Sequence, residues 1–452
     1  FSDLYKAYYP AAKAILAENG TSRLAETMRQ GAGGFVNLPI LGWLFAPFGL
    51  FPPTEAGYAF LALGVVATIS AWYSLARLAN LDRNQSLLLL FLFAANGPLH
   101  NSLREGNTTH FILLLLVLGM WMTRRKRDFL AGLIFGFAAL IKLPLLLLGI
   151  FFAARGRWRI ALGGATVCGV AALGSLLLFG WDLHVFWYEH SIKPFAETPL
   201  AAFNVQSVQG FFARLQHGDR YLVDWTPHAL HPAVRIAGKL AALALLGVAA
   251  FVIAGPGLFR RGRLLQPESA ALVELETCSV VLLATMISTV SWSHYYLWML
   301  LPAAYLIGGT TQVFADRRIR WTGWVALIAA MPPAAGMIPI TRPVIQPRAS
   351  DHFSETISDQ RGQMFQLSLR LLAVTLVVSL CQLLTLLLQI FQLLFNPLLL
   401  QLQLLLLMLQ LLVLLLMLAL LLLKLLPLFV SLLQLLLKQQ QLLFELFGTR
   451  LE

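Results

Sequence analysis

The chain has 452 residues, of which 58% are hydrophobic and only 12% are charged, and its mean hydropathy is +0.75. An ordinary soluble domain carries about 25% charged residues. The composition therefore excludes a soluble domain and predicts an all-α, polytopic integral membrane protein. The formal net charge is +12, but the arginines gather in short clusters between apolar runs, as they do in cytoplasmic loops. Membrane lipids are thus expected as partners, and nucleic acid is not.

The N-terminal residues 1–34 are expected to form an extracytoplasmic loop or juxtamembrane helix. Within them, residues 2–16 are amphipathic and rich in aromatic side chains. Carboxylates are scarce in this chain, so Asp3, placed before the first apolar run, is a candidate catalytic group. The alternative is a solvated helix N-cap. The sequence starts at Phe1 rather than Met, and we expect that a first transmembrane helix precedes it.

A transmembrane core is predicted over residues 35–340. Its first expected spans are 35–51, 57–79, 85–98 and 111–123, the last of which ends on the basic run 124–127. Two full crossings by 35–51 and 57–79 would place the later basic clusters on the wrong side of the membrane. The expected topology therefore needs either a re-entrant segment at 35–51 or a half-span at 85–98.

Residues 129–153 form an apolar stretch that Lys142-Leu143-Pro144 interrupts, and basic residues flank both of its ends. A single span would place one basic cluster on each side of the membrane. Two short limbs that turn at Lys142 to Pro144 are therefore expected.

The second half of the core continues with expected spans at 160–179, 233–254, 270–290, 295–314 and 321–338. A loop is expected over 180–231 and another, extracytoplasmic one over 341–366. Leu- and Gln-rich residues 367–452 are expected to add C-terminal transmembrane segments. This layout places the basic clusters on the cytoplasmic side and the polar turns on the other. The cysteines Cys168, Cys278 and Cys381 lie in apolar segments without metal-ligand or redox spacing.

Six short motifs occur in order between Asp3 and about Leu306. They are Asp3-Leu4-Tyr5-Lys6-Ala7-Tyr8-Tyr9-Pro10-Ala11-Ala12, the segment 38–50, Arg104-Glu105-Gly106-Asn107, the segment 128–144, Asn204-Val205-Gln206-Ser207 and Ser291-Trp292-Ser293-His294-Tyr295-Tyr296. Together they resemble the GT-C superfamily of polyprenyl-phosphate-sugar-dependent glycosyltransferases and are most similar to glycosyltransferase family 87. The family's usual Gly-Gln-x-Asn turn appears here as Glu105-Gly106-Asn107-Thr108.

The resemblance implies a GT-C helical bundle in the bacterial inner membrane, with its site on the extracytoplasmic side. It implies transfer of a sugar, with mannose the first expectation, from a polyprenyl-phosphate donor to a lipid or glycan acceptor. It also makes Asp3 the general base of an inverting displacement. Independently of any family, such chemistry needs a base, cationic groups or hydrogen-bond donors that bind the phosphate, and a groove open to lipid. No cofactor is expected.

Lys142 is the candidate contact of the lipid phosphate, with snorkelling to the interface as its alternative. His294 is expected to act in catalysis by contacting the phosphate or the acceptor, although the aromatic residues around it could be an interfacial belt. No metal site is expected, because His100 and His110 are too loosely spaced. The remaining expected site residues are Arg104 and Tyr295 at the donor phosphate, and Tyr8, Tyr9, Asn107, Asn204, Gln206, Ser207 and Trp292 at the sugar or acceptor.

Other readings of these residues stay open. Asn204 to Ser207 could only cap a loop, and the Arg104–Glu105 pair could be purely structural. A non-catalytic GT-C-derived subunit of a larger membrane complex is the alternative function. A secondary transporter is less well supported, because no inverted repeat is visible. Rival carboxylates outside the motifs are Asp182, Glu189, Asp219 and Asp224.

Overall fold

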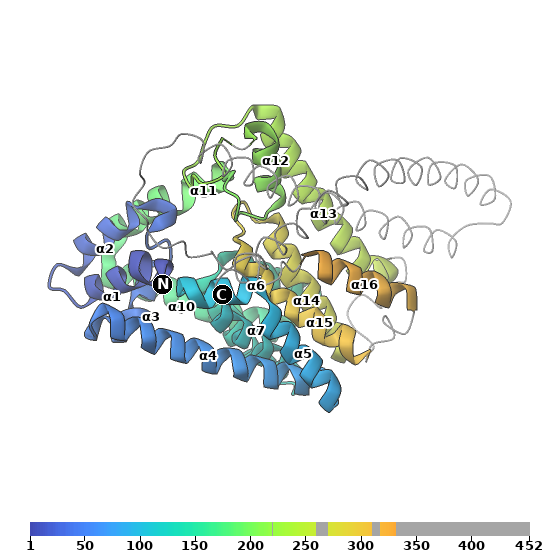
Figure 1. Cartoon of the computed structure of the whole chain (residues 1–452). Helices are drawn as coiled ribbons and strands as arrows, with labels where there is room; N and C mark the ends of the chain where they lie inside the picture. Colours follow the sequence, from blue (N-terminus) through green and yellow to red (C-terminus); the bar gives the residue numbers. More distant parts are fainter. Residues whose placement is uncertain (219, 259–269, 310–316, 331–452) are drawn as a thin grey trace, which may run out of the picture. The chain divides into compact units, whose positions relative to one another are not determined.

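Helices make up nearly all of the regular structure in the described part of the chain (Figure 1). The computed structural model describes residues 1–218, 220–258, 270–309 and 317–330. The α-helices in these residues are α1 (Tyr9–Ile15), α2 (Gly20–Met28), α3 (Gly42–Phe45), α4 (Pro53–Leu78), α5 (Arg83–Ala95), α6 (Gly97–Glu105), α7 (Thr109–Arg124), α8 (Asp128–Ile141), α9 (Leu147–Ala154), α10 (Trp158–Trp187), α11 (Lys193–Glu197), α12 (Val208–His217), α13 (Pro232–Leu258), α14 (Ala270–Ile287), α15 (Leu300–Gly308) and α16 (Arg317–Ala330).

Shorter helical turns connect them. The π-helices are η1 (Leu4–Tyr8) and η6 (Tyr188–Ile192), and the 3₁₀-helices are η2 (Gly31–Gly33), η3 (Pro39–Leu41), η4 (Ala46–Leu50), η5 (Leu143–Leu146) and η7 (Ser293–Met299). The described residues contain no strand, and an isolated β-bridge joins Val205 to Trp292. The all-α class is confirmed.

Four helices in the described part are long and apolar enough to cross a membrane alone: α4, α10 with its continuation to Glu197, α13 as far as Ala250, and α14. The pair α6 and α7, bent by 118°, would make a fifth if it is one broken span. The long helices coincide with the spans expected at 57–79, 160–179, 233–254 and 270–290. The chain is therefore a multi-pass membrane protein.

Three expected elements differ from the structure. Residues 35–51 are not one span but the short pieces η3, α3 and η4, because their prolines cannot donate within a helix. The loop expected over 180–231 was wrong: α10 continues through a kink at Gly180, and η6, α11 and α12 follow. The span expected to begin at 295 starts instead as the 3₁₀-helix η7 and continues as α15.

Several expectations fall outside the described residues. These are the ends of the spans 295–314 and 321–338, the loop 341–366, the segment 367–452, Cys381 and Asp219.

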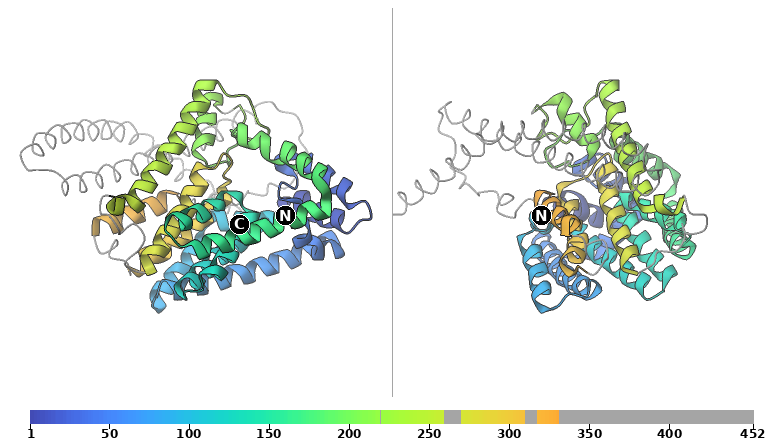
Figure 2. Two further views of the ribbon diagram at one scale, coloured as in Figure 1. Left: turned by 180° about the vertical axis from the view of Figure 1, so that it is seen from behind. Right: turned by 90° about the vertical axis from the view of Figure 1, so that its right-hand side faces the viewer.

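The interruption predicted at Lys142 is confirmed, because α8 ends at Ile141 and η5 and α9 follow. Lys142 itself has extended backbone angles, φ −131° and ψ 88°. The α8 limb lies against α10 (Figure 2). A side chain on Gly132 or on Gly163 would collide with a backbone carbonyl of the other helix. Small residues thus let two membrane helices approach closely, as they commonly do.

Two ion pairs hold α14 against its neighbours. Glu274 accepts from Arg124 at the end of α7 and, at 2.8 Å, from the Tyr305 hydroxyl of α15. Glu276 accepts from Arg155, which follows α9. The sequence did not single out these glutamates, because their partners lie 150 and 121 residues away along the chain.

Removing either partner of the Arg124–Glu274 pair should lower the unfolding free energy by different amounts. The Glu274 side chain is 1% exposed, whereas that of Arg124 is 28% exposed. Arg124→Gln leaves a buried carboxylate uncompensated and should cost about 3–5 kcal/mol of unfolding free energy. Glu274→Gln should cost less, since water can still reach Arg124. Equilibrium unfolding in mixed detergent micelles measures both.

The control is Glu26→Gln, which removes an exposed pair with Arg29 in α2 and should change stability by no more than about 1 kcal/mol. Equal losses for Arg124→Gln and Glu274→Gln would contradict the prediction.

Candidate active site

Asp3 lies beside the turn between α6 and α7. It occupies the N-cap position of η1, but its side chain makes no capping hydrogen bond. Its carboxylate instead accepts from Asn107 Nδ2 at 2.5 Å and from the Ser2 hydroxyl at 3.4 Å. Gly106, with φ +67°, makes this approach possible, because a Cβ there would lie 2.8 Å from the Cβ of Leu4. The site therefore depends on a left-handed glycine.

Asn107 joins the carboxylate to a buried ammonium. Its Oδ1 accepts from the backbone N–H of Thr109 at 3.0 Å, from the Thr109 hydroxyl at 2.6 Å and from Lys142 Nζ at 3.3 Å. These three donors fix the orientation of the amide, so that its Nδ2 faces Asp3. Asn107 is only 4% exposed. One rigid amide thus sets the separation between Asp3 and Lys142.

Lys142 reaches this amide from the break after α8. Its ammonium also lies over the ring of Tyr295, with Nζ 4.8 Å from the ring centroid. Among the described residues, no carboxylate lies within ion-pair distance of Lys142. A buried ammonium held by an amide and an aromatic face keeps donor capacity for an anion.

His294 and Tyr295 come from η7. Tyr295 stacks on Trp298 with 5.2 Å between ring centroids, and Trp298 Nε1 donates to the carbonyl of Thr109 at 3.3 Å. This contact ties η7 to the start of α7. His294 is 6% exposed, and its Nε2 has no hydrogen-bond partner in the described structure. Burial, and then the positive charge of Lys142, hold the pKa of His294 well below its usual range, so its imidazole is neutral.

The electrostatics of Asp3 suit a base. Burial raises the pKa of the Asp3 carboxyl, and the hydrogen bond from Asn107 and the charge of Lys142 oppose that rise without cancelling it. A carboxylate with a raised pKa is a stronger proton acceptor than one in water, provided that it is still ionised at the working pH.

The loop 204–207 is fastened to the segment that precedes η7. Gln206 N–H donates to Ser291 O at 2.6 Å, and Ser293 N–H donates to Asn204 O at 2.7 Å. The side chains are engaged within the protein: Asn204 accepts from Trp225, Gln206 donates to Phe203 O, and Ser207 caps α12 through Gly210. The predicted loop therefore adjoins the His294 turn, with its polar groups already paired.

The other predicted residues lie around this centre. Tyr8 is buried and stacks on Phe45, with 4.4 Å between ring centroids. Tyr9 donates its hydroxyl to Phe51 O at 2.9 Å. Trp292 precedes η7 and forms the bridge to Val205.

Arg104 lies at a more exposed edge and binds Glu105, with Nη2 2.7 Å from Oε1. Glu105 also accepts from the Ser2 hydroxyl, so the pair continues the hydrogen-bonded network that reaches Asp3.

His110, near the start of α7, was not among the predicted site residues. It is 1% exposed, its Nδ1 lies 3.0 Å from the Ser102 hydroxyl, and its Nε2 has no hydrogen-bond partner within the described ranges. Asn107 lies before α7 begins at Thr109, so helix periodicity in the sequence does not link the two residues. No group of three potential metal ligands occurs in the described ranges.

Comparison with known proteins matches residues 35–289 to Glycosyltransferase family 87. The match covers more than half of the chain and includes Asn107, Lys142 and the loop 204–207. Asp3 and His294 lie beyond its two ends. No solved structure matches the chain.

Curated relatives agree with this match. A polyprenol-phosphate-mannose-dependent alpha-(1-2)-phosphatidylinositol mannoside mannosyltransferase of Mycobacterium tuberculosis is 26% identical over 290 residues, 61% of this chain and 62% of the relative. A polyprenol-phosphate-mannose-dependent alpha-(1-2)-phosphatidylinositol pentamannoside mannosyltransferase of Mycolicibacterium smegmatis is 26% identical over 297 residues, 65% of this chain and 66% of the relative. The chain thus spans slightly less than two thirds of each relative's length.

The left-handed turn makes a testable prediction. Gly106→Ala should destabilise the protein by about 1–3 kcal/mol, because φ +67° strains an alanine and its Cβ would press on Leu4. Gly169→Ala is the matched control, since a Cβ on this exposed residue of α10 meets no neighbour. The control should leave stability unchanged or raise it by up to about 1 kcal/mol. Equal unfolding free energies for the two variants would contradict the role of Gly106.

Proposed function

Because this chain belongs to glycosyltransferase family 87, we propose that it transfers mannose from a polyprenyl-phosphate donor to a hydroxyl of a glycolipid or glycan acceptor. The proposal rests on the family and on the printed activities of the relatives. The observation that carries it is the hydrogen-bonded link from Asp3 through Asn107 to Lys142. A base and a cation are held at fixed separation by one amide, as a displacement at a sugar phosphate requires.

In the proposed reaction Asp3 is the general base. Its carboxylate takes the proton of the acceptor hydroxyl as that oxygen attacks the anomeric carbon. The bond from this carbon to the phosphate oxygen breaks, and its electron pair leaves with the polyprenyl phosphate. A single displacement of this kind inverts the configuration at the anomeric carbon. General base catalysis of this type contributes about 10²- to 10⁴-fold in rate.

Lys142 and His294 are the proposed phosphate contacts. The ammonium balances the charge that the leaving phosphate gains, and Tyr295 holds the ammonium in place through its ring. The neutral imidazole of His294 can donate one N–H to a phosphate oxygen, in the tautomer that carries the proton on its unpartnered nitrogen. Arg104, at the exposed edge of the same network, is proposed to attract the donor's phosphate.

The sugar and acceptor are proposed to lie on the Asp3 side of this phosphate. Tyr8, Tyr9 and Asn107 are the proposed sugar contacts. The loop with Asn204, Gln206 and Ser207, together with Trp292, is proposed to border the acceptor, since it is hydrogen-bonded to the segment that leads into His294.

The proposed location of the protein is the bacterial inner membrane, with the site on the extracytoplasmic side. The basic run 124–127 follows the end of α7 that is opposite to Asn107, and basic runs favour the cytoplasmic side. Nothing in the described part of the chain favours the alternative of a non-catalytic subunit in a larger membrane complex.

Removal of the proposed base is the direct test of function. Asp3→Asn should lower transfer of radiolabelled mannose from polyprenyl-phosphate mannose to a native lipid extract by about 10²- to 10⁴-fold. The control Asp182→Asn removes an exposed carboxylate of α10 and should keep wild-type activity. Equal transfer by Asp3→Asn and the wild type would place the base elsewhere. A folded wild-type protein inactive with every polyprenyl-phosphate sugar would overturn the proposed function.

The pH dependence of transfer tests the environment of Asp3. A base acts only when deprotonated, and the pKa of Asp3 is raised. Activity should therefore fall as the pH drops through a midpoint above about 3.9, the ordinary aspartate value. Lys142→Met removes a charge that lowers this pKa, so the midpoint should move to higher pH. The profile of Asp182→Asn should match that of the wild type, and an unmoved or lower midpoint in Lys142→Met would contradict the assignment.

A further inference from the structure

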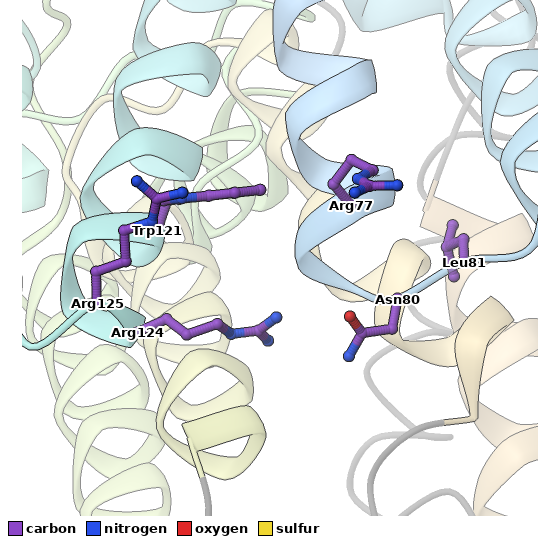
Figure 3. Close-up of a pocket in the computed structure, with 6 residues that line it drawn as sticks. All are labelled: Arg77, Asn80, Leu81, Trp121, Arg124 and Arg125. Atoms are coloured by element: carbon purple, nitrogen blue, oxygen red, sulfur yellow. The ribbon is translucent and has the colours of Figure 1, made fainter.

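A polar cavity lies between the C-terminal ends of α4 and α7 (Figure 3). Its volume is about 420 Å³. The lining residues come from the end of α4 and the short segment after it, and from the last turn of α7: Arg77, Asn80, Leu81, Trp121, Arg124 and Arg125. Three arginines thus contribute to the lining of one space.

Two of the three arginines that line this cavity have no carboxylate partner among the described residues. Arg124 is paired with Glu274 and also donates to the carbonyl of Leu78. Arg77 and Arg125 have no carboxylate within ion-pair distance among the described residues. The guanidinium of Arg125 lies 5.4 Å from the ring centroid of Trp121. The nearest acids along the chain are engaged elsewhere: Asp82 caps α5 through the N–H of Gln85, at 2.8 Å, and Asp128 lies 3.9 Å from Arg157.

The cavity is separate from the proposed catalytic centre. Asn107 lies just before α7, which begins at Thr109, and Arg124 ends that helix 15 residues after Thr109. At 1.5 Å per residue the two ends of the helix are about 22 Å apart. Both α4 and α7 run from the Asp3 end to the arginine end, because Gly64 lies against His110 and Leu78 O accepts from Arg124. The cavity therefore cannot hold the phosphate of the reacting donor.

The outer face of α4 leads from the membrane into this cavity. Ile69 and Tyr73 are 55% and 59% exposed, and they precede Arg77 at intervals of four residues. Residues four apart lie on one face of a helix, so an apolar stripe ends at a guanidinium. Arginines at the end of a membrane helix, beside a tryptophan, mark the interface where lipid phosphates lie.

We propose that this cavity binds the phosphate of an anionic phospholipid, whose acyl chains lie along the Ile69 and Tyr73 face of α4. Arg77 and Arg125 supply the charge that the phosphate neutralises, and guanidinium forks suit phosphate oxygens. The Asn80 amide is a further hydrogen-bonding group at the cavity wall. A free phosphate ion shares the headgroup chemistry but makes no use of the apolar stripe.

Lipid retention by the purified protein tests this proposal without any transfer assay. Nanodiscs of phosphatidylcholine are compared with nanodiscs that also contain phosphatidylglycerol, and bound phosphatidylglycerol is counted by native mass spectrometry after extraction. The double variant Arg77→Gln, Arg125→Gln should bind phosphatidylglycerol about 30-fold more weakly, since each arginine that lines the cavity and faces the phosphate contributes about fivefold. The matched control is Lys126→Gln, Arg127→Gln, which removes two charges from the same basic run outside the cavity. It should retain wild-type binding.

Every other outcome counts against the site. Wild-type binding by the cavity variant would overturn the proposed site. An equal loss of binding in the control would show that the lipid is attracted by the basic run as a whole and not by the cavity. Displacement of the lipid by excess inorganic phosphate, or equal retention of phosphatidylcholine, would show that the cavity selects no anionic lipid. If the double variant does not fold, Arg77→Gln alone should weaken binding about fivefold. The readout is independent of mannose transfer, so it succeeds or fails separately from the proposed function.

Discussion

The amide of Asn107 bridges the carboxylate of Asp3 and the ammonium of Lys142, which do not contact each other directly. The positions of the surrounding helices depend on this bridge. Lys142 is buried and Asp3 is partly buried, and neither is neutralised by a direct ion pair. Each retains donor or acceptor capacity for a substrate, at the cost of leaving buried charge incompletely paired. The surrounding elements must therefore be rigid, because a half-satisfied polar network is unstable.

Each element at the centre breaks a regular pattern to meet that requirement. The chain bends by 118° between α6 and α7 so that Asn107 can face Asp3. The apolar stretch after α7 is interrupted at Lys142, and η7 replaces the start of an expected span so that His294 and Tyr295 reach the same place. Away from this centre the ion pair of Arg124 with Glu274 fixes the other end of α7. One helix thus has the proposed catalytic charge network at its start and a structural ion pair at its end.

The sequence predicted those features that depend on local chemistry. Pro144 and the flanking basic residues were sufficient to predict the interruption at Lys142, and uninterrupted apolar length was sufficient for α4, α13 and α14. The continuation of α10 past Gly180 was missed, because its polar C-terminal part follows a kink and looks like a loop by composition. The partners of Asp3 and Glu274 could not be predicted, since they are 104 and 150 residues away and only the fold brings them together. His110 was missed for a related reason: its burial beside Ser102 is a tertiary property.

The most direct test of the central claim is an experimental structure with polyprenyl phosphate bound, determined by cryo-electron microscopy in nanodiscs. The phosphate should lie within hydrogen-bond distance of Lys142 Nζ and His294, with the Asp3 carboxylate across an open space large enough for a sugar and an acceptor hydroxyl. A phosphate bound in the arginine cavity at the far end of α7, with the Asp3 and Lys142 side chains away from it, would contradict the claim.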